Sequence, residues 1–353
     1  MKKGIPYTEL LRELISIPAL SRREEKRADF LEEFLESLGY PVQRMQNNIL
    51  LSGVKPGKAA FTLLLNSHLD TVAPVDGWES DPFDALSEEG KITGLGSNDA
   101  GASVVTLIAA YHSMVEELAP SIHLMLLISA EEEISGANGI TSMLPVLEDV
   151  DGVIVGEPTG MKPAVAERGL MVLDAELSGV AGHAARKEGI NAIYAALKDV
   201  EAISRLEFPE VSKWLPEPGA QVTMISAGTG HNVVPDLCKF VVDVRSNDCY
   251  GNEDLLARIS SVCKGKLTPR STRLKSSVLD EDHLLMKVVK EMGLEAFGSS
   301  TLSDMALIPY PALKMGPGDS ARSHTAGEYI LESELEQAVE AYCAFLAKLK
   351  TMV

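Results

Sequence analysis

The stretch LLLNSHLDTVAP, residues 63–74, joins an uninterrupted apolar run to a histidine and an aspartate two positions apart. An apolar run without alternation is typical of a strand buried on both faces, as in a parallel sheet covered by helices. A strand end that meets water would explain a single pair such as His68 and Asp70 equally well. The two interpretations differ in whether other strands of the chain also end in polar, metal-binding side chains.

Apolar runs alternate with helical patterns in the first half of the chain. Strands are predicted at 61–65, 122–129 and 152–157, with a helix at 102–118. Two amphipathic helices precede them, in YTELLRELISI and EEKRADFLEEFLESLG. This alternation predicts an α/β fold with a mostly parallel sheet flanked by helices.

The pattern changes near residue 168. Strand, helix, strand, strand, helix and strand are predicted in turn for GLMVLDAELSG, INAIYAALKDVEAISRL, AQVTMISAG, LCKFVVDVRS, NEDLLARISSVCKG and TPRSTRL. That order is the ferredoxin-like α+β unit. The first pattern returns near residue 277, and 353 residues exceed the usual size of one hydrophobic core. We therefore predict a sheet domain of residues 1–167 plus 277–353 and an inserted domain of residues 168–276.

The charge balance and the cysteines limit the function classes. The 51 acidic residues outnumber the 32 basic ones, and the net charge of −19 argues against nucleic acid or an anionic membrane surface as a partner. None of the four cysteines forms a Cys-x-x-Cys pair, which indicates reduced packing residues. The basic start MKKG precedes no apolar signal-peptide region, and no segment reaches the roughly 18 apolar residues of a membrane span. We expect a soluble, cytoplasmic protein.

Metal-binding side chains follow the predicted strands of the sheet domain, each after a separate apolar run. They are His68, Asp99, the triplet Glu131 to Glu133, Glu157 and His324. Ligands of open α/β sheets bind beyond the carboxyl ends of the strands, so these residues are expected to converge. Two histidines and three carboxylates suit two divalent ions with one bridging carboxylate. A structural zinc is disfavoured because the set lacks cysteine.

The stretch GLGSNDAG has a second interpretation as a dinucleotide-binding loop. Gly94 and Gly96 match the first half of Gly-x-Gly-x-x-Gly, but Asp99 occupies the third glycine position. A carboxylate there would repel a pyrophosphate, so the metal interpretation is preferred.

Seven stretches resemble, in order, the sequence blocks of the di-zinc amidohydrolase and metallopeptidase family that includes acetylornithine deacetylase, succinyl-diaminopimelate desuccinylase, aminoacylase and carboxypeptidase. They are SHLDTVAP, GLGSNDAGAS, SAEEEISGANG, VGEPT, GVAGHAARKEGINAI, NVVPDLC and GPGDSARSHTAGEY, which span nearly the whole chain. The resemblance implies a zinc-exopeptidase-like catalytic domain with an inserted lid and dimerisation domain. Within the family, the short length and the GPGDS…H ending look most like the acetylornithine and N-acetyl-lysine deacetylases.

The resemblance also implies the metal ligands. One ion would take His68 and Glu157, the other would take Glu133 and His324, and Asp99 would bridge the two. Zinc is the implied metal, with cobalt or manganese as alternatives.

The catalytic roles follow from the same resemblance. Aligning ISGANG with the turn that follows the family's acidic triplet makes Glu132 the general base and Glu133 the ligand, with Glu131 structural. Asp70 would accept a hydrogen bond from the other ring nitrogen of His68 and fix its tautomer. Glu132 would take a proton from a metal-activated water and return it to the departing amine.

Four further residues are candidates for substrate contacts. By itself, His183 has the pattern of a turn residue, whereas the family match makes it an oxyanion-stabilising group that reaches another subunit's site. Asn232 and Arg245 match positions that bind the substrate carboxylate, a task suited to a guanidinium, although Arg245 also fits an exposed strand-end cation. Arg322, two residues before His324, is a candidate for binding a succinyl carboxylate.

The implied reaction is hydrolysis of the amide bond of an N-acyl amino acid. The best-matching substrates are N-acetyl-ornithine and N-succinyl-ornithine, which would place the enzyme in arginine biosynthesis. An aminoacylase, a dipeptidase or a succinyl-diaminopimelate desuccinylase are the alternatives within the family. An inactive relative would show changes among the ligands or the base, and none of these six positions is altered. A homodimer through the inserted domain is expected, because a ferredoxin-like sheet leaves edge strands open.

Overall fold

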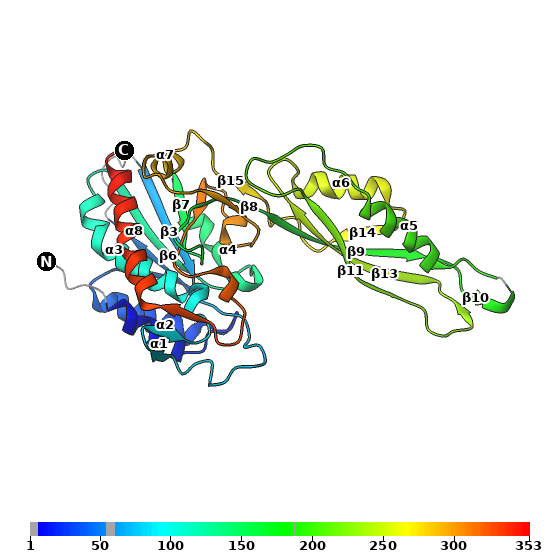
Figure 1. Cartoon of the computed structure of the whole chain (residues 1–353), viewed down its shortest axis with the longest axis horizontal. Coiled ribbons are helices and arrows are strands. Elements are labelled where there is room, and N and C mark those ends of the chain that lie inside the picture. Colours follow the sequence, from blue (N-terminus) through cyan, green and yellow to red (C-terminus); the bar gives the residue numbers. More distant parts are fainter. Residues whose placement is uncertain (1–5, 54–60, 187) are drawn as a thin grey trace. The chain divides into compact units, whose positions relative to one another are not determined.

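The computed structural model describes residues 6–53, 61–186 and 188–353. The basic start of the chain, residues 1–5, and the lysine of GHAARKEG at position 187 lie outside the described residues. The chain forms two compact units (Figure 1). Unit 1 comprises the described residues up to Val165 together with Leu279–Phe297 and Ser303–Val353, and unit 2 comprises Ala166–Val278 and Gly298–Leu302. The limits of unit 2 lie two residues outside the predicted boundaries, and the sequence does not predict the return of residues 298–302 to it.

Unit 1 is built on a sheet whose central strands are parallel. The strand order is β1-β2-β6-β3-β7-β17-β8, and β6, β3, β7 and β17 run parallel to one another. The bounds are β1 Val42–Met45, β2 Asn48–Ser52, β3 Phe61–His68, β6 Ile122–Ser129, β7 Gly152–Val155, β8 Ala164–Glu167 and β17 Ala312–Lys314. Every residue of β3 and β6 is buried, which explains their continuous apolar runs. The predicted α/β class is confirmed.

Helices and short segments cover both faces of this sheet. Helix α3, Ala102–Leu118, contacts β3 and β6, and α8, Glu332–Lys350, packs on α3. On the other face, Leu64 packs with the short helix α4, Ile140–Met143. Side chains alternate along a strand, so His68 emerges on the same face as Leu64.

The remaining elements of unit 1 frame the sheet. They are α1 Tyr7–Ser16, α2 Glu25–Ser37, α7 Leu284–Glu291 and a small sheet of β4 Leu86–Glu88, β5 Lys91–Thr93 and β18 Tyr329–Leu331. Strand β16, Phe297–Ser299, begins at the last residue of the Leu279–Phe297 part of unit 1 and continues into unit 2. The predicted α1 and α2 are confirmed. In the stretches 6–53, 61–186 and 188–353, no helix combines the length and the apolar character that a membrane crossing needs.

Unit 2 has the ferredoxin-like order of elements. These are β9 Gly169–Ser178, α5 Ala192–Ser204, β11 Gly219–Ala227, β13 Leu237–Ser246, α6 Asn252–Val262 and β14 Lys266–Pro269. The antiparallel sheet has the order β11-β13-β9-β14. One face, with Leu173 and Phe240, packs on Ala196 of α5 and Ile259 of α6. Two short strands, β10 Gly182–His183 and β12 Val233–Val234, pair beside this sheet, and β15 Ser277–Val278 pairs with β8.

The predicted last strand of unit 2, TPRSTRL at 268–274, is wrong in position. Strand β14 spans Lys266–Pro269, and only an isolated bridge joins Leu274 to Leu170. The side chain that packs on the core is Leu267, which precedes the predicted segment. Pro269 is compatible with this edge strand because the next residue, Arg270, donates its N–H to the backbone oxygen of Val172 at 2.9 Å, so the proline nitrogen faces away from β9.

Candidate metal centre

Three neighbouring strands of unit 1 end at the same place. β3 ends at His68, Glu132 and Glu133 follow the end of β6, and Glu157 follows the end of β7. Because β6, β3 and β7 are adjacent and parallel, their carboxyl ends meet at one edge of the sheet. This edge is where open α/β sheets bind their ligands.

Asp99 lies between two histidines at this edge. Its Oδ1 is 3.2 Å from Nε2 of His68, and its Oδ2 is 3.6 Å from Nε2 of His324. Asp99 belongs to the segment Ser97–Gly101 that leads into α3, and His324 follows β17. A carboxylate with one oxygen directed at each of two other ligands has the geometry that a bridging ligand of a two-metal site needs.

Two further acids each lie beside one histidine. Oε2 of Glu133 is 3.1 Å from Nε2 of His324, and Oε1 of Glu157 is 3.7 Å from Nε2 of His68. Ligand-type atoms of His68, Asp99 and Glu133 all lie within 4.8 Å of one another. The five residues that the sequence predicts as metal ligands therefore lie together.

Glu132 is at the same edge, with Oε2 3.8 Å from Nε2 of His68. Burial raises the pKa of Glu132 well above its ordinary value, against the lowering effect of His68. Burial also raises the pKa of Glu157 to about 8. A carboxyl group whose pKa is moved towards neutrality is suited to accept and return a proton. Ligand-type atoms of His68, Glu132 and Glu157 lie within 4.8 Å of one another, so Glu132 is also within reach of a cation.

Asp70 orients both His68 and the acidic triplet. Nδ1 of His68 is 3.0 Å from the backbone oxygen of Asp70 and 3.4 Å from its carboxylate, so the nearest acceptor is not the predicted side chain. The Asp70 carboxylate instead accepts hydrogen bonds from the backbone N–H groups of Glu132 and Glu133, at 3.0 and 3.3 Å, and from the hydroxyl of Ser21. Asp70 therefore links the end of β3 to the triplet after β6.

The cluster carries a large excess of negative charge. Six carboxylates surround His68 and His324, namely those of Asp70, Asp99, Glu132, Glu133, Glu157 and Asp304. Burial lowers the pKa of His68, but the carboxylates outweigh this effect and hold that pKa well above its ordinary value. Buried charges are stable only when they are paired, and imidazole with carboxylate is a donor set that zinc and similar divalent ions accept. The residues therefore fit the divalent ions that the family resemblance implies.

The candidate residues of unit 2 fall into two places. His183 on β10 pairs with Val233 and lies beside Asn232, whose backbone oxygen accepts from the N–H of Ala184 at 3.1 Å. Nδ1 of His183 accepts from the N–H of Ala185, which is the role of a turn residue. Arg245 lies at the opposite end of β13, and its guanidinium binds both carboxylate oxygens of Asp243, at 2.7 and 3.0 Å.

Arg322 is in unit 1 and is engaged within it. Its NH1 group is 2.7 Å from Oε2 of Glu334, and its guanidinium carbon lies 4.4 Å from the centre of the Tyr329 ring. A succinyl carboxylate would therefore compete with Glu334 for this side chain.

Two buried acids near the site are not found by the sequence patterns. The Glu328 carboxylate accepts hydrogen bonds from the backbone N–H groups of Gly96, Asn98 and Asp99, and burial raises its pKa to about 7. Asp304 accepts from the hydroxyl of Ser129 at 2.5 Å, and burial raises its pKa to about 6. Neither Glu328 nor Asp304 directly follows a buried apolar run, which is the pattern that identifies the ligands. For Glu328, the only feature of the sequence that points to the site is its closeness to His324 in HTAGEY.

The chain belongs to peptidase family M20/M25/M40, whose family model matches residues 64–348. It is therefore an amidohydrolase or peptidase of that family. Acetylornithine deacetylase from Proteus mirabilis (strain HI4320) is 24% identical over 381 aligned positions, which cover 96% of this chain and 97% of that protein.

Solved structures show the same fold. The aminopeptidase PepT from Bacillus cereus has a TM-score of 0.79 at 18% identity, covering 97% of this chain and 98% of its own. A dinuclear metal-binding peptidase of the M20 family from Bacillus subtilis has a TM-score of 0.69 at 17% identity, covering 97% of this chain and 96% of its own. The family and the fold predicted from the sequence are confirmed.

Proposed function

We propose that this protein hydrolyses the amide bond of an N-acyl amino acid with two bound divalent ions, and that its substrate is an N-acyl-ornithine. The position of Asp99 between His68 and His324 carries the proposal for two ions. The Bacillus subtilis structure, described as dinuclear, supports the same number. His68 and Glu157 would hold one ion, Glu133 and His324 the other, and Asp99 both. Zinc is the proposed metal.

The chemistry follows from the surroundings of Glu132. The bound ions would lower the pKa of a water molecule and polarise the amide carbonyl. Glu132 takes the proton of that water and returns it to the departing amine, for which its raised pKa is suited. The carboxylate of Asp70 holds the backbone N–H of Glu132 at 3.0 Å, which keeps this base beside His68.

The proposed substrate rests on likeness and charge. The relative from Proteus mirabilis is an acetylornithine deacetylase and aligns over 96% of this chain. The net charge of −19 favours the approach of a substrate with a cationic side chain. Because Arg322 is bound to Glu334, we favour acetyl over succinyl as the acyl group. Asn232 and Arg245 are proposed to bind the carboxylate of the substrate. The activity is proposed to be cytoplasmic and to serve arginine biosynthesis, and the four free cysteines are compatible with a reducing compartment.

The test is a comparison of substrates after metal removal and reconstitution with two equivalents of zinc or cobalt. N-acetyl-ornithine, N-acetyl-lysine, N-succinyl-ornithine, N-acetyl-methionine and a dipeptide are assayed side by side. We expect the highest kcat/KM for N-acetyl-ornithine. A higher value for N-acetyl-methionine would make the protein a general aminoacylase, and a higher value for the dipeptide would make it a peptidase.

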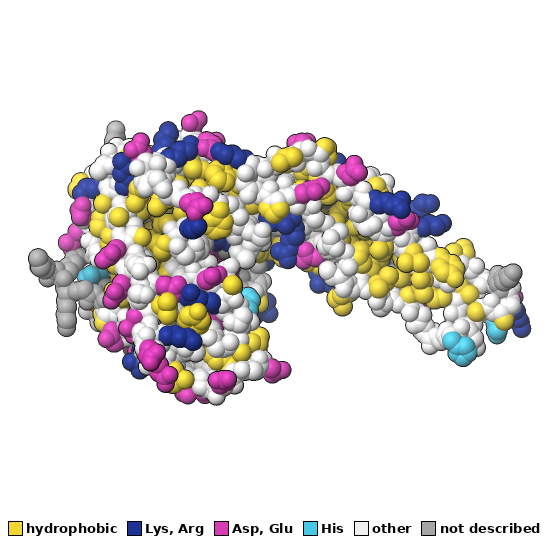
Figure 2. Space-filling view, viewed as in Figure 1, with side chains coloured by type: hydrophobic (Ala, Val, Ile, Leu, Met, Phe, Trp, Pro, Cys, Tyr) yellow, Lys and Arg dark blue, Asp and Glu magenta, His cyan; other side chains and the backbone are white. Residues whose placement is uncertain are grey.

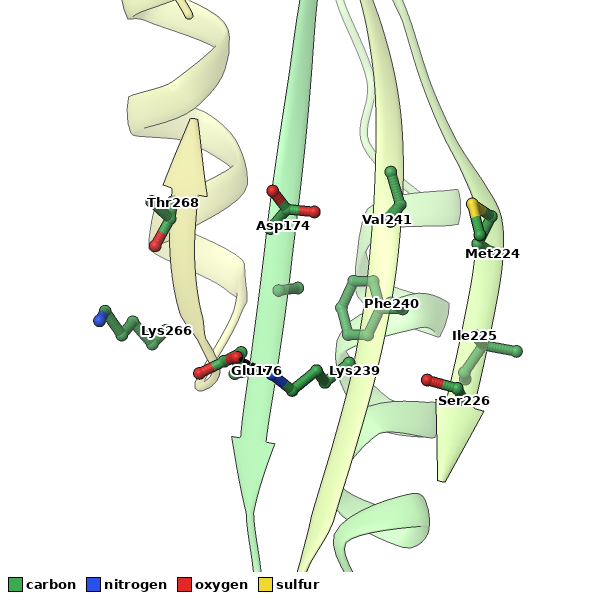
Figure 3. Close-up of a pocket in the computed structure, with 11 residues that line it drawn as sticks. Asp174, Glu176, Met224, Ile225, Ser226, Lys239, Phe240, Val241, Lys266 and Thr268 are labelled. Carbon is green, nitrogen blue, oxygen red and sulfur yellow. Dashed lines mark ion pairs between the residues drawn. The ribbon is translucent and has the colours of Figure 1, made fainter. Parts of the chain in front are cut away.

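We also propose that unit 2 forms a homodimer. The edge strand β11 exposes Met224 and Ile225, with exposed fractions of 66% and 55%. Met224 pairs with Val241 of β13, and the side chain of Ile225 points away from β13 (Figure 3). Helix α5, which contacts β11, exposes Tyr194 and Leu197. Figure 2 shows hydrophobic side chains gathered over the part of unit 2 that holds α5. An open strand edge beside exposed apolar side chains favours pairing with a second copy. A double Met224→Asp, Ile225→Asp variant should sediment as a monomer, and an unchanged mass would contradict this interface.

A further inference from the structure

A single carboxylate binds three backbone N–H groups of the segment that carries Asp99. Oε1 of Glu328 accepts from the N–H groups of Asn98 and Asp99, both at 2.9 Å, and Oε2 accepts from the N–H of Gly96 at 3.2 Å. The backbone oxygen of Glu328 accepts from the N–H of Gly94 at 3.0 Å. Glu328 has an exposed fraction of 1%, so no water competes for these hydrogen bonds.

Asn98 makes a second link between the segment that carries Asp99 and the segment that carries His324 and Glu328. Its side-chain nitrogen donates to the backbone oxygen of Asp319 and to the hydroxyl of Ser323, both at 3.1 Å. Its side-chain oxygen accepts from the N–H of Asp319 at 3.0 Å. Gly318 is packed so closely that a Cβ there would lie 2.1 Å from this oxygen. His324 lies between Ser323 and Glu328, so both links flank it.

We infer that Glu328, together with Asn98, is a positioning residue that fixes Asp99 relative to His324 and thereby sets the affinity for one of the two ions. The two segments lie more than two hundred residues apart in sequence, and these hydrogen bonds join them directly. Besides Asp99, the ion beside His68 would be held by His68 and Glu157 at the ends of β3 and β7, two strands that pair in the sheet. The ion beside His324 would have only one such ligand besides Asp99, because Glu133 follows the end of β6 whereas His324 lies in a loop after β17.

This inference rests on the proposed two-ion site, and it predicts an asymmetric loss of metal. In Glu328→Gln the side chain keeps its length, but an NH2 group replaces one of the two acceptor oxygens. The hydrogen bond from the N–H of Gly96, or those from Asn98 and Asp99, must then be lost. Residues that orient metal ligands typically change metal affinity by about 10- to 100-fold when they are mutated. We expect that loss for the ion beside His324 and little change for the other.

The experiment titrates metal-free protein with Zn²⁺ by calorimetry and measures the bound metal by elemental analysis. Wild type should bind close to two ions and Glu328→Gln close to one at the same free concentration, and Asn98→Ala should behave in the same way. Asp199→Asn is the matched control. Asp199 is also a buried carboxylate that accepts backbone N–H groups, those of Lys264 and Gly265 at 2.9 and 2.8 Å, but it lies in the core of unit 2.

Each outcome separates the inference from the proposed function. If wild type binds fewer than two ions, the two-ion site itself is wrong. If wild type binds two and Glu328→Gln binds two with unchanged affinity, the positioning role is wrong. If Glu328→Gln loses both ions equally and melts as Asp199→Asn does, the carboxylate has only a structural role. Loss of one ion in a folded Glu328→Gln protein, with two retained in Asp199→Asn, supports the inference.

Discussion

Removing the metal ions should make the stability of unit 1 fall as the pH rises from 6 to 8. Without cations, burial holds the pKa of Glu157 at about 8, whereas the same carboxyl in the unfolded chain has a pKa of 4.5. The folded state therefore binds a proton that the unfolded state does not, and stability decreases with pH throughout this window. Glu133 and Asp99 raise the pKa of His324 from 6.5 to about 9. Between pH 6.5 and 9 the folded state therefore also retains the proton of His324, which makes stability fall further as the pH rises.

The size of the effect follows from the number of retained protons. One proton held by the folded state alone changes the free energy of unfolding by about 1.4 kcal/mol per pH unit, or about 3 kcal/mol between pH 6 and 8. A change of 1 kcal/mol moves the melting temperature of a domain of this size by about 2–4 °C. Asp70 and Asp99 have lowered pKa values, which affect stability only in more acidic solution.

The assay is calorimetric melting at pH 6, 7 and 8, with a chelator in one series and two equivalents of zinc in the other. The metal-free protein should melt several degrees lower at pH 8 than at pH 6. With zinc, the cations replace the protons and the slope should be much smaller. Glu157→Gln should reduce the slope of the metal-free protein, because the amide does not titrate. A metal-free melting temperature that stays level or rises over this range would refute the reasoning.

Three further outcomes test the site and the fold. Glu132→Gln should abolish turnover while retaining both metal ions, whereas Glu133→Gln should lose metal as well as turnover. If Glu132→Gln loses metal instead, Glu132 is the ligand and the assignment of roles within the acidic triplet is wrong by one residue. Mixed His183→Ala and Glu132→Gln subunits should recover activity after confirmed subunit exchange, and no recovery would mean that His183 does not act in trans. Gly156→Ala should destabilise unit 1 by about 1–3 kcal/mol in denaturant unfolding, because a Cβ there would lie 2.7 Å from Cδ1 of Leu107; an unchanged midpoint would show that α3 can move away.

The bounds of the buried elements of unit 1 could be predicted closely, because a buried element consists of a continuous or periodic run of apolar residues. Helix α3 and strand β6 have the predicted bounds, 102–118 and 122–129, since their apolar patterns begin and end with the elements. Edge elements carry less of this signal. Among the described strands, β14 pairs only with β9, and one partly buried leucine does not define its limits, so its predicted position is wrong. Residues at the ends of buried strands, such as His68, can therefore be found from the pattern.

The residues that hold those ligands in place have no comparable signal. Glu328 and Asn98 act through backbone N–H groups and short polar contacts, and a backbone N–H is the same at every position except proline. No spacing rule connects residue 328 to residue 99, because the contact depends on two loops meeting in space. Arg322 is an opposite case, in which the sequence suggests a role that the fold does not favour. Its position two residues before His324 suggests a substrate contact, whereas in the folded chain it forms an ion pair with Glu334. Sequence patterns thus identify the groups that can bind metal, whereas the hydrogen bonds between distant loops determine which of them are held at the distances that binding requires.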